Sequence, residues 1–350
     1  MDTMLMKGNE AIGEAAIIAG CRFYFGYPIT PQNELPAYMA ARMPRVGGTF
    51  LQAESEVAAI NMVFGASAAG ARVMTSSSSP GVSLKMEGVS YMAGAELPAV
   101  VVNMMRGGPG LGNIAGAQGD YFQAVKGGGH GDYHSIVLAP STVQELADLT
   151  VKAFDLADEY RMVVILLGDG FTGQMSEPIT LPKPSGRTFD KGGWALSGAK
   201  DREPHLVASM RLNPDDALAA LNDRLQAKYR LVESRETMWE SRDTEDADTL
   251  LVGFGLSARI CRSAVSVLRK GGIKAGLFRP ITLWPFPSAP LAAAAAGKRT
   301  VLVVEMNAGQ MLQDVRLAVG AAVPVEFYGT PGGLTPQVDQ IVERITRNVG

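Results

Sequence analysis

The chain has 350 residues, of which 47% are hydrophobic, and it carries a formal net charge of −3 at neutral pH. A chain of this length buries more than one hydrophobic core, so we expect two or three domains. The weak negative charge gives no general attraction to nucleic acid or to anionic membranes. No apolar run reaches the ~18 residues of a membrane helix, and the N-terminal residues lack a signal-peptide pattern. A cytoplasmic location is therefore expected.

Strand-like and helix-like runs alternate over residues 1–181. Apolar periodicity predicts helices at residues 11–20, 57–69 and 141–159. Short apolar runs predict strands at residues 22–25, 72–75, 99–105 and 163–167. Such alternation is typical of an α/β domain with a largely parallel sheet and helices on both of its faces.

The alternation stops at residues 182–247, where Pro, Gly and charged residues dominate and only residues 215–231 have the pattern of a good helix. This segment is predicted to be a linker or excursion. The pattern resumes over residues 248–350, with predicted strands at 249–253, 275–278 and 300–305 and helices at 257–270 and 310–319. A second, smaller α/β domain is expected there.

The chain contains two cysteines, Cys21 and Cys261, each within an apolar segment. Buried, reduced thiols are typical of that setting. Two thiols are too few for an ordinary four-cysteine iron–sulfur cluster, so the chain is not expected to hold one.

Two segments together combine a rigid loop with a buried carboxylate. Residues 26–31, Gly-Tyr-Pro-Ile-Thr-Pro, end an apolar strand, and the two prolines hold Thr30 on an exposed loop. Glu54 and Glu56 open a predicted helix that is apolar on almost every side, so they point into protein or into a site. We interpret the two segments as a functional site. The residues alone equally allow carboxylates that only stabilise a helix N-terminus.

These motifs resemble the α subunit of the 2-oxoacid:ferredoxin oxidoreductases. The resemblance is carried by residues 27–31 (YPITP), 52–61 (QAESEVAAIN) and 94–99 (GAELPA). Residues 106–113 and 126–131 most resemble the branched-chain type, 2-oxoisovalerate:ferredoxin oxidoreductase. Residues 283–287 and 304–310 resemble the transketolase C-terminal-type domain of the same subunit, so the resemblance spans nearly the whole chain.

The resemblance implies an α/β fold in which residues 1–181 form a thiamine-diphosphate pyrimidine-binding-type parallel-sheet domain. Residues 248–350 would form the smaller transketolase C-terminal-type domain. The implied reaction is oxidative decarboxylation of a 2-oxoacid with coenzyme A, which gives acyl-CoA, CO2 and reduced ferredoxin. Branched-chain 2-oxoacids are the expected substrates, and 2-oxoglutarate and aromatic 2-oxoacids stay open.

The resemblance also implies a hetero-oligomer, such as a dimer of heteromers. A β subunit would carry the diphosphate and Mg2+ half of the thiamine-diphosphate site, and γ and ferredoxin-like δ subunits would complete the complex. Mg2+ and the iron–sulfur clusters would lie on these partner subunits. Residues 168–170, Gly-Asp-Gly, could open a magnesium motif of their own. No asparagine follows between residues 191 and 200 to close it, so no metal site is expected in this chain.

Three kinds of site residue follow from the resemblance. Glu56 is the expected catalytic residue, because a carboxylate bonded to the pyrimidine ring nitrogen promotes proton removal from the thiazolium ring. Thr30 and Arg106 are expected to bind the substrate, through a fixed hydroxyl and a guanidinium suited to a carboxylate. The expected cofactor contacts are Glu56, Pro28, Ile29, Ser78 and Ser79.

Each role has a simpler alternative. Thr30 on its own is better explained as a turn residue, Arg106 is explained almost as well by a salt bridge, and residues 76–79 by a helix-capping loop. A non-catalytic structural subunit and another type of thiamine enzyme are the competing functions. The missing diphosphate motif argues against a self-sufficient thiamine enzyme. A carboxylate buried beside a hydroxyl loop argues against a scaffold.

Overall fold

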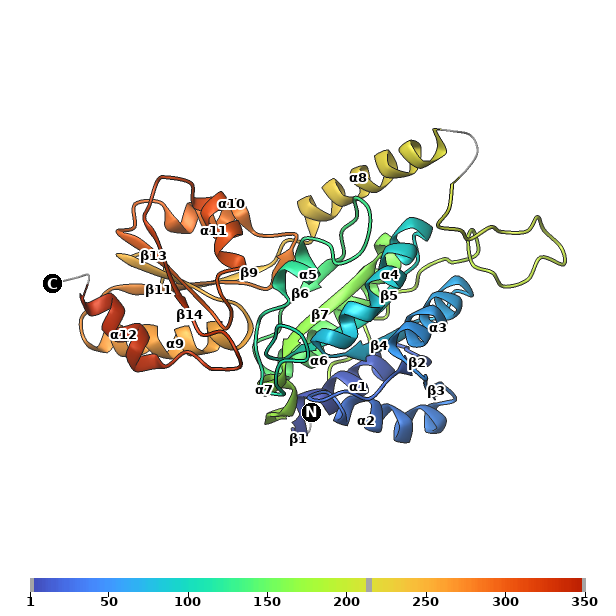
Figure 1. Cartoon of the computed structure of the whole chain (residues 1–350), viewed down its shortest axis with the longest axis horizontal. Coiled ribbons are helices and arrows are strands. Elements are labelled where there is room, and N and C mark those ends of the chain that lie inside the picture. Colours follow the sequence, from blue (N-terminus) through green and yellow to red (C-terminus); the bar gives the residue numbers. More distant parts are fainter. Residues whose placement is uncertain (1–2, 212–215, 348–350) are drawn as a thin grey trace.

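The computed structural model describes residues 3–211 and 216–347, which form two α/β domains lying side by side (Figure 1). The first domain is built on a seven-stranded sheet in the order β12-β6-β7-β5-β4-β2-β3. Its strands are β2 (Phe23–Gly26), β3 (Thr49–Gln52), β4 (Val73–Ser77), β5 (Ala99–Met105), β6 (Ile136–Leu138), β7 (Val163–Asp169) and β12 (Thr282–Trp284). All pair in parallel except the edge strand β12.

Helices cover both faces of this sheet, as the alternating pattern predicts. They are α1 (Gly8–Ile18), α2 (Glu34–Arg42), α3 (Glu56–Ala68), α4 (Ser79–Ala95) and α6 (Val143–Tyr160). Right-handed crossovers place α2 and α6 on one face and α3 and α4 on the other. Accordingly α1 packs against α2 and α6, whereas α3 packs against α4. Strands β5 and β7 are buried along their whole length, which explains their continuous apolar sequences.

Shorter elements complete the first domain. The turn η1 (Met43–Val46) precedes β3, α5 (Tyr121–Val125) lies after β5, and α7 (Gly170–Gln174) follows β7. Strands β1 (Met4–Lys7) and β8 (Ser176–Ile179) form a separate antiparallel pair.

The second domain has a five-stranded sheet in the order β14-β13-β10-β11-β9. Its strands are β9 (Trp239–Arg242), β10 (Thr249–Val252), β11 (Ala275–Pro280), β13 (Thr300–Glu305) and β14 (Val325–Gly329). Helices α9 (Gly255–Lys270) and α12 (Val338–Arg347) pack together, and so do α10 (Ser288–Ala295) and α11 (Met311–Val319) (Figure 1). The two helix pairs lie on opposite sides of the sheet.

The segment predicted as a linker contains two ordered elements. Helix α8 (Ala217–Arg235) corresponds to the helix predicted at residues 215–231, although Asp215 lies outside the described residues. Strand β9 pairs antiparallel with β11, so it extends the second sheet. Before α8, an extended stretch of chain projects from the body of the first domain (Figure 1).

Strand β12 and a set of polar contacts join the domains. Strand β12, which follows β11 of the second sheet in sequence, pairs with β6 of the first sheet. The buried Gln118 side chain donates from Nε2 to the Phe254 carbonyl (2.8 Å) and accepts from Ser257 Oγ (2.8 Å) and the Met306 amide (3.0 Å). These bonds fix the segment after β5 against the second domain.

Three further observations concern the described part of the chain. Cys21 and Cys261 are both buried and unpaired. None of the helices there is both long and apolar enough to span a membrane. The same residues include no group of three or more His, Cys, Asp or Glu side chains arranged to hold a metal ion.

Candidate active site

The predicted site residues converge at the carboxyl ends of β2, β4 and β5. These parallel strands are neighbours in the sheet, so the loops that follow them share one edge. Residues 27–33 follow β2, Ser78 and Ser79 follow β4, and Arg106 follows β5. The Ala53 amide donates to the Gly26 carbonyl (2.9 Å), which brings the loop before α3 to the same edge.

Glu56 is the first residue of α3 and only 6% of its surface is exposed. The hydroxyl of Ser55 caps the helix by accepting a bond from the Ala58 amide (3.2 Å), so the helix starts without help from the Glu56 side chain. No described residue forms a hydrogen bond or salt bridge with the Glu56 carboxylate. A buried carboxylate in that state is costly unless a ligand supplies its partner.

Gly81, in the first turn of α4, leaves the space that the Glu56 carboxylate occupies. A side-chain carbon at position 81 would lie 2.5 Å from Glu56 Oε1 and 2.1 Å from Ser77 Oγ. The hydroxyls of Ser77 and Ser78 are buried and have no hydrogen-bond partner among the described residues. We call Glu56, Ser77, Ser78 and Gly81 the cradle. It gathers one carboxylate and two hydroxyls that lack partners.

Ser79 holds the cradle to β5. Its backbone has φ of 25°, a strained left-handed conformation for a residue with a side chain. Its hydroxyl donates to Asp120 Oδ2 (2.6 Å) and accepts from the Arg106 amide (3.0 Å), and its own amide donates to Asn103 Oδ1 (3.0 Å). Burial raises the pKa of Asp120, and bonds from Ser79 and Asn103 oppose that rise. The Ser79 hydroxyl is therefore engaged within the chain, unlike those of Ser77 and Ser78.

Arg106 lies at the end of β5 with 8% of its surface exposed. Its Nη1 donates to the Thr30 carbonyl and its Nη2 to the Leu111 carbonyl, each at 2.9 Å. Its Nε has no partner among the described residues, and no carboxylate there lies within salt-bridge distance. The structure thus does not contain the salt bridge that would explain Arg106 most simply. A buried guanidinium bound only to carbonyls keeps its charge available for an anion.

Thr30 lies next to Arg106, which donates to its carbonyl. Thr30 Oγ1 accepts a bond from Asn33 Nδ2 (3.2 Å), so its hydroxyl proton is free to donate. Pro28 is exposed and Ile29 is half-buried. Gln32 ties this loop to the end of β4, because Ser76 Oγ donates to its side-chain oxygen (2.5 Å).

Lys85 is a member of the site that the sequence did not reveal. It lies on α4, is completely buried, and donates to Thr75 Oγ1 and to the Ser76 carbonyl. Burial lowers the pKa of Lys85 to about 7, and the negative charge of Glu56 opposes the shift. The sequence offers only a weak indication of this role, namely a lysine one helical turn after Gly81 in a segment of small and apolar residues.

Asp169 performs a structural task at the end of β7. Its carboxylate caps α7 by accepting bonds from the Thr172 amide (2.9 Å) and hydroxyl (3.0 Å). A side-chain carbon at Gly170 would lie 2.6 Å from Pro31, so the Gly-Asp-Gly triplet lets the loop after β2 pack closely on this turn.

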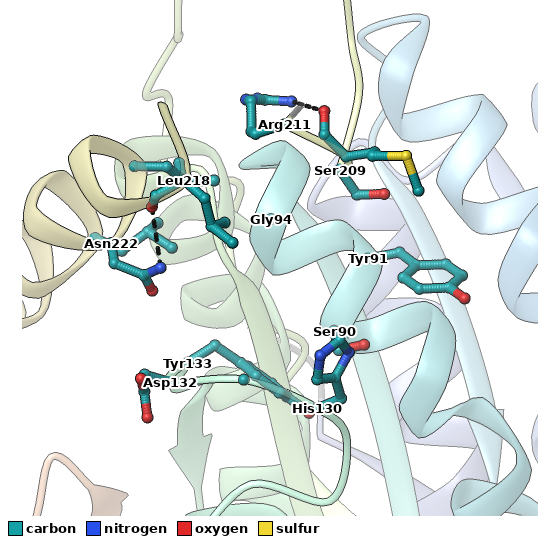
Figure 2. Close-up of a pocket in the computed structure, with 14 residues that line it drawn as sticks. Ser90, Tyr91, Gly94, His130, Asp132, Tyr133, Ser209, Arg211, Leu218 and Asn222 are labelled. Carbon is teal, nitrogen blue, oxygen red and sulfur yellow. Dashed lines mark hydrogen bonds between the residues drawn. The ribbon is translucent and has the colours of Figure 1, made fainter. Parts of the chain in front are cut away.

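A separate cavity of about 570 Å³ lies elsewhere on the first domain. It is bounded by the C-terminal half of α4, the loop at residues 130–133, residues 209–211 and α8 (Figure 2). None of the predicted site residues lines it. The cavity is therefore separate from the candidate site at the carboxyl ends of β2, β4 and β5.

Comparison with known proteins identifies the family. Residues 14–240 match the family "Pyruvate flavodoxin/ferredoxin oxidoreductase, thiamine diP-bdg", and residues 247–341 match "Pyruvate:ferredoxin oxidoreductase core domain II". The ketoisovalerate oxidoreductase subunit VorB of Methanothermobacter marburgensis is 50% identical, with 100% of this chain and 99% of that protein covered. The chain belongs to the 2-oxoacid:ferredoxin oxidoreductase family. It is a subunit of such an enzyme, as the sequence motifs predict.

Other members of the 2-oxoacid:ferredoxin oxidoreductase family are more distant. The 2-oxoglutarate synthase subunit KorA of Methanothermobacter thermautotrophicus is 37% identical over 98% of both chains. The solved 2-oxoglutarate:ferredoxin oxidoreductase from Magnetococcus marinus, with 2-oxoglutarate, coenzyme A and succinyl-CoA bound, is 30% identical with a TM-score of 0.90. It matches 100% of this chain and 66% of its own. The relatives' names as subunits indicate a multi-subunit complex.

Thiamine diphosphate, which the family implies, fits the residues of the candidate site. The cradle offers a buried carboxylate and two buried hydroxyls without partners, next to space that only a glycine leaves open. An aminopyrimidine ring has nitrogen atoms that both donate and accept hydrogen bonds, so it matches this set of oxygens.

Proposed function

We propose that this chain is the α subunit of a branched-chain 2-oxoacid:ferredoxin oxidoreductase and that Glu56 is its catalytic residue. The observation that carries the proposal is the Glu56 carboxylate, buried without a partner beside Gly81 in a domain of the thiamine-diphosphate-binding family. A scaffold subunit gains nothing from that arrangement, because removing a buried carboxylate would stabilise it.

The cradle would hold the pyrimidine side of thiamine diphosphate. The bound cofactor supplies a nucleophilic carbon and accepts the electrons released when the 2-oxoacid loses CO2. Glu56 then holds a proton at its carboxylate or yields it to the ring nitrogen. Ser77 and Ser78 provide hydroxyls beside it, Ser79 fixes their backbone, and Pro28 and Ile29 form the rigid wall of the site.

Arg106 and Thr30 would bind the 2-oxoacid. The guanidinium of Arg106 donates only to carbonyl oxygens and forms no salt bridge with a described carboxylate, so the substrate carboxylate would be its direct ionic partner. The Thr30 hydroxyl has a free donor for the same carboxylate or the adjacent keto oxygen. The two residues are coupled, because Arg106 holds the Thr30 carbonyl at 2.9 Å.

Exposed residues in the loops around the candidate site, such as Pro28 and Leu111, support a site completed by another subunit. We propose that a β subunit covers this site and supplies the diphosphate and Mg2+ contacts, while iron–sulfur clusters on γ and δ subunits pass electrons to ferredoxin. Coenzyme A would take the acyl group. A cytoplasmic complex of these chains is the corresponding assembly.

The identities favour a branched-chain substrate. The ketoisovalerate oxidoreductase subunit matches 50% of residues, against 37% for the 2-oxoglutarate synthase subunit. The loop that Arg106 holds also carries the exposed apolar residues Leu111 and Ile114. Such side chains suit a branched hydrocarbon better than the second carboxylate of 2-oxoglutarate.

Turnover of the co-purified complex on a panel of 2-oxoacids tests this function. The panel contains 2-oxoisovalerate, pyruvate, 2-oxoglutarate and an aromatic 2-oxoacid, with coenzyme A and ferredoxin supplied. We expect the highest kcat/KM for 2-oxoisovalerate. A preference for 2-oxoglutarate would overturn the substrate assignment, and no turnover of any 2-oxoacid would overturn the function.

A further inference from the structure

Lys85 is a buried lysine that the reaction as described does not use. Its side chain is completely buried, whereas Glu87 on the same helix is exposed. Its Nζ donates only to neutral oxygens, Thr75 Oγ1 and the Ser76 carbonyl. No carboxylate of the described residues lies within salt-bridge distance of it. A lysine is rarely buried without an ionic partner unless its charge has a functional role.

The helix geometry directs Lys85 toward the cradle. Gly81 and Lys85 are four residues apart, so they lie on the same face of α4. Side chains on a helix lean toward its N-terminus, so the Lys85 side chain extends toward the turn that contains Gly81. That turn is the one against which Glu56 Oε1 rests.

Glu56 is the charged group that acts on Lys85. Strand β4 presents the neutral Thr75 and Ser76, and β2 presents Tyr24, whose phenol is neutral and hydrogen-bonded to Ser76 (2.5 Å). Burial raises the pKa of this phenol. The other charged groups near α4 have partners other than Lys85. Asp120 and Arg106 contact Ser79, and Glu87 accepts a bond from Tyr91 (2.6 Å).

We propose that Lys85 is a positioning residue that sets the charge of the catalytic Glu56. As an ammonium it stabilises the ionised carboxylate and so favours the proton on the cofactor ring. As a neutral amine it lets Glu56 retain the proton. This inference rests on the proposed role of Glu56. Burial lowers the pKa of Lys85 to about 7, so both states occur close to neutral pH.

Nuclear magnetic resonance of the full chain tests the coupling without any turnover. The lysines carry a 13C label at Cε, and the resonance missing from Lys85→Met identifies Lys85. We expect a titration midpoint near pH 7 that falls by about one pH unit in Glu56→Gln, because the negative charge that favours the ammonium is gone. An ordinary midpoint near ~10.4, or a midpoint unchanged by Glu56→Gln, would overturn the inference.

Kinetics of the assembled complex test the consequence for the reaction. A coupling of about one pH unit is a tenfold change in proton affinity, so Lys85→Met should lower kcat about tenfold with KM for the 2-oxoacid unchanged. It should also remove an ionisation near pH 7 from the pH profile of kcat. Lys228→Met is the matched control, since Lys228 is largely buried on α8 and pairs with Glu96 (2.9 Å). A pH profile equal to that of the control would contradict the role of Lys85.

The two proposals fail separately. If Glu56→Gln abolishes turnover but leaves the Lys85 titration unchanged, the inference about Lys85 is wrong and the proposed function stands. If Glu56→Gln turns over normally, the catalytic role of Glu56 is wrong, whatever the lysine titration shows.

Discussion

Two buried polar clusters of this chain differ in how completely their hydrogen bonds are made. At the junction of the domains, the side-chain oxygen and nitrogen of Gln118 both have partners. Glu305 beside it accepts bonds from Asn307, Met311 and Leu312, each at 2.9 Å. At the candidate site, the Ser77 and Ser78 hydroxyls and the Arg106 Nε are buried without partners, and the Glu56 carboxylate has no hydrogen bond or salt bridge to a described residue.

This difference in hydrogen bonding suggests a structural role for the first cluster and a functional role for the second. A fully satisfied cluster stabilises one arrangement of the chain, so changing it should cost stability. A cluster with unmet hydrogen bonds costs stability until a ligand arrives, so changing it should cost activity. The sequences of both clusters contain polar residues next to buried strands. The two clusters differ in whether their buried polar atoms have hydrogen-bond partners.

The largest effect is expected at Glu56. Glu56→Gln should lower turnover of the complex by ~10²–10⁴-fold, because an amide does not exchange a proton with the cofactor ring. Thermal stability and complex assembly should be retained, since no described residue bonds the carboxylate. Steady-state kinetics and cofactor content check the result, and Glu54→Gln is the control because Glu54 is exposed. Near-normal turnover with thiamine diphosphate bound would refute the assignment.

The second-largest loss of activity is expected at Arg106. Arg106→Met should reduce transition-state binding of the 2-oxoacid by about 2–5 kcal/mol, measured from kcat/KM, with a smaller loss of thermal stability. Arg72 is the matched control, because its guanidinium is paired with Asp155 (2.8 Å) and Asp158 (2.7 Å). Arg72→Met should show the reverse pattern. Intact kinetics and a large drop in Tm for Arg106→Met would make Arg106 a structural residue.

Lys85 gives a pH-dependent change in stability. Its pKa is lowered to about 7 in the folded chain, whereas an unfolded lysine titrates near ~10.4. Between these values the unfolded chain binds more protons, so the stability of the folded state rises with pH over this window. The cost of burying Lys85 is complete below pH 7. Removing it by Lys85→Met should raise the free energy of unfolding by on the order of 2–4 kcal/mol at pH 6, falling toward zero near pH 10.

Urea unfolding of the full chain at pH 6, 8 and 10 measures this trend. Lys228→Met should instead lose stability, because it breaks the ion pair with Glu96. An effect of Lys85→Met that is destabilising and constant across pH would mean that its hydrogen bonds outweigh the cost of its charge.

The smallest effect is expected at Gln118, in the fully hydrogen-bonded cluster between the domains. Gln118→Ala should lower the free energy of unfolding by about 1–3 kcal/mol, because it leaves three buried groups of the second domain without this hydrogen-bond partner. Denaturant unfolding checks this, with the exposed Gln313→Ala as control. If Gln118→Ala matched that control, the domains would be held mainly by β12, apolar packing and the other polar contacts, such as the ion pair of Arg279 with Glu145.

The sequence predicted the parts of the fold that depend on local periodicity. The strands at residues 99–105 and 300–305 were placed at their observed bounds, because both are continuous apolar runs. Strand β9 was missed because its sequence, Trp-Glu-Ser-Arg, has no apolar pattern and its pairing with β11 supplies the order. The pairing of β12 with β6 joins segments far apart in sequence, so no local signal predicts it.

Residues of the candidate site could be predicted only where a sequence motif pointed to them. Glu56 was predicted as a site residue because it opens an apolar helix, and Thr30 because prolines flank it. Lys85 was missed because its burial depends on the packing of α4 against α3 and the sheet. Helix α4 itself begins with Ser78 as its N-cap and Pro80 in its first turn, residue types that favour a helix start.

Calorimetric titration of Mg2+ and thiamine diphosphate tests the central claim, that this chain carries one half of a shared cofactor site. The experiment compares the isolated chain with the complex that contains its partner subunits. We predict tight binding to the complex and no site of micromolar or better affinity on the isolated chain, because the cradle would hold only the pyrimidine side of the cofactor. Micromolar or tighter binding to the isolated chain would contradict the account.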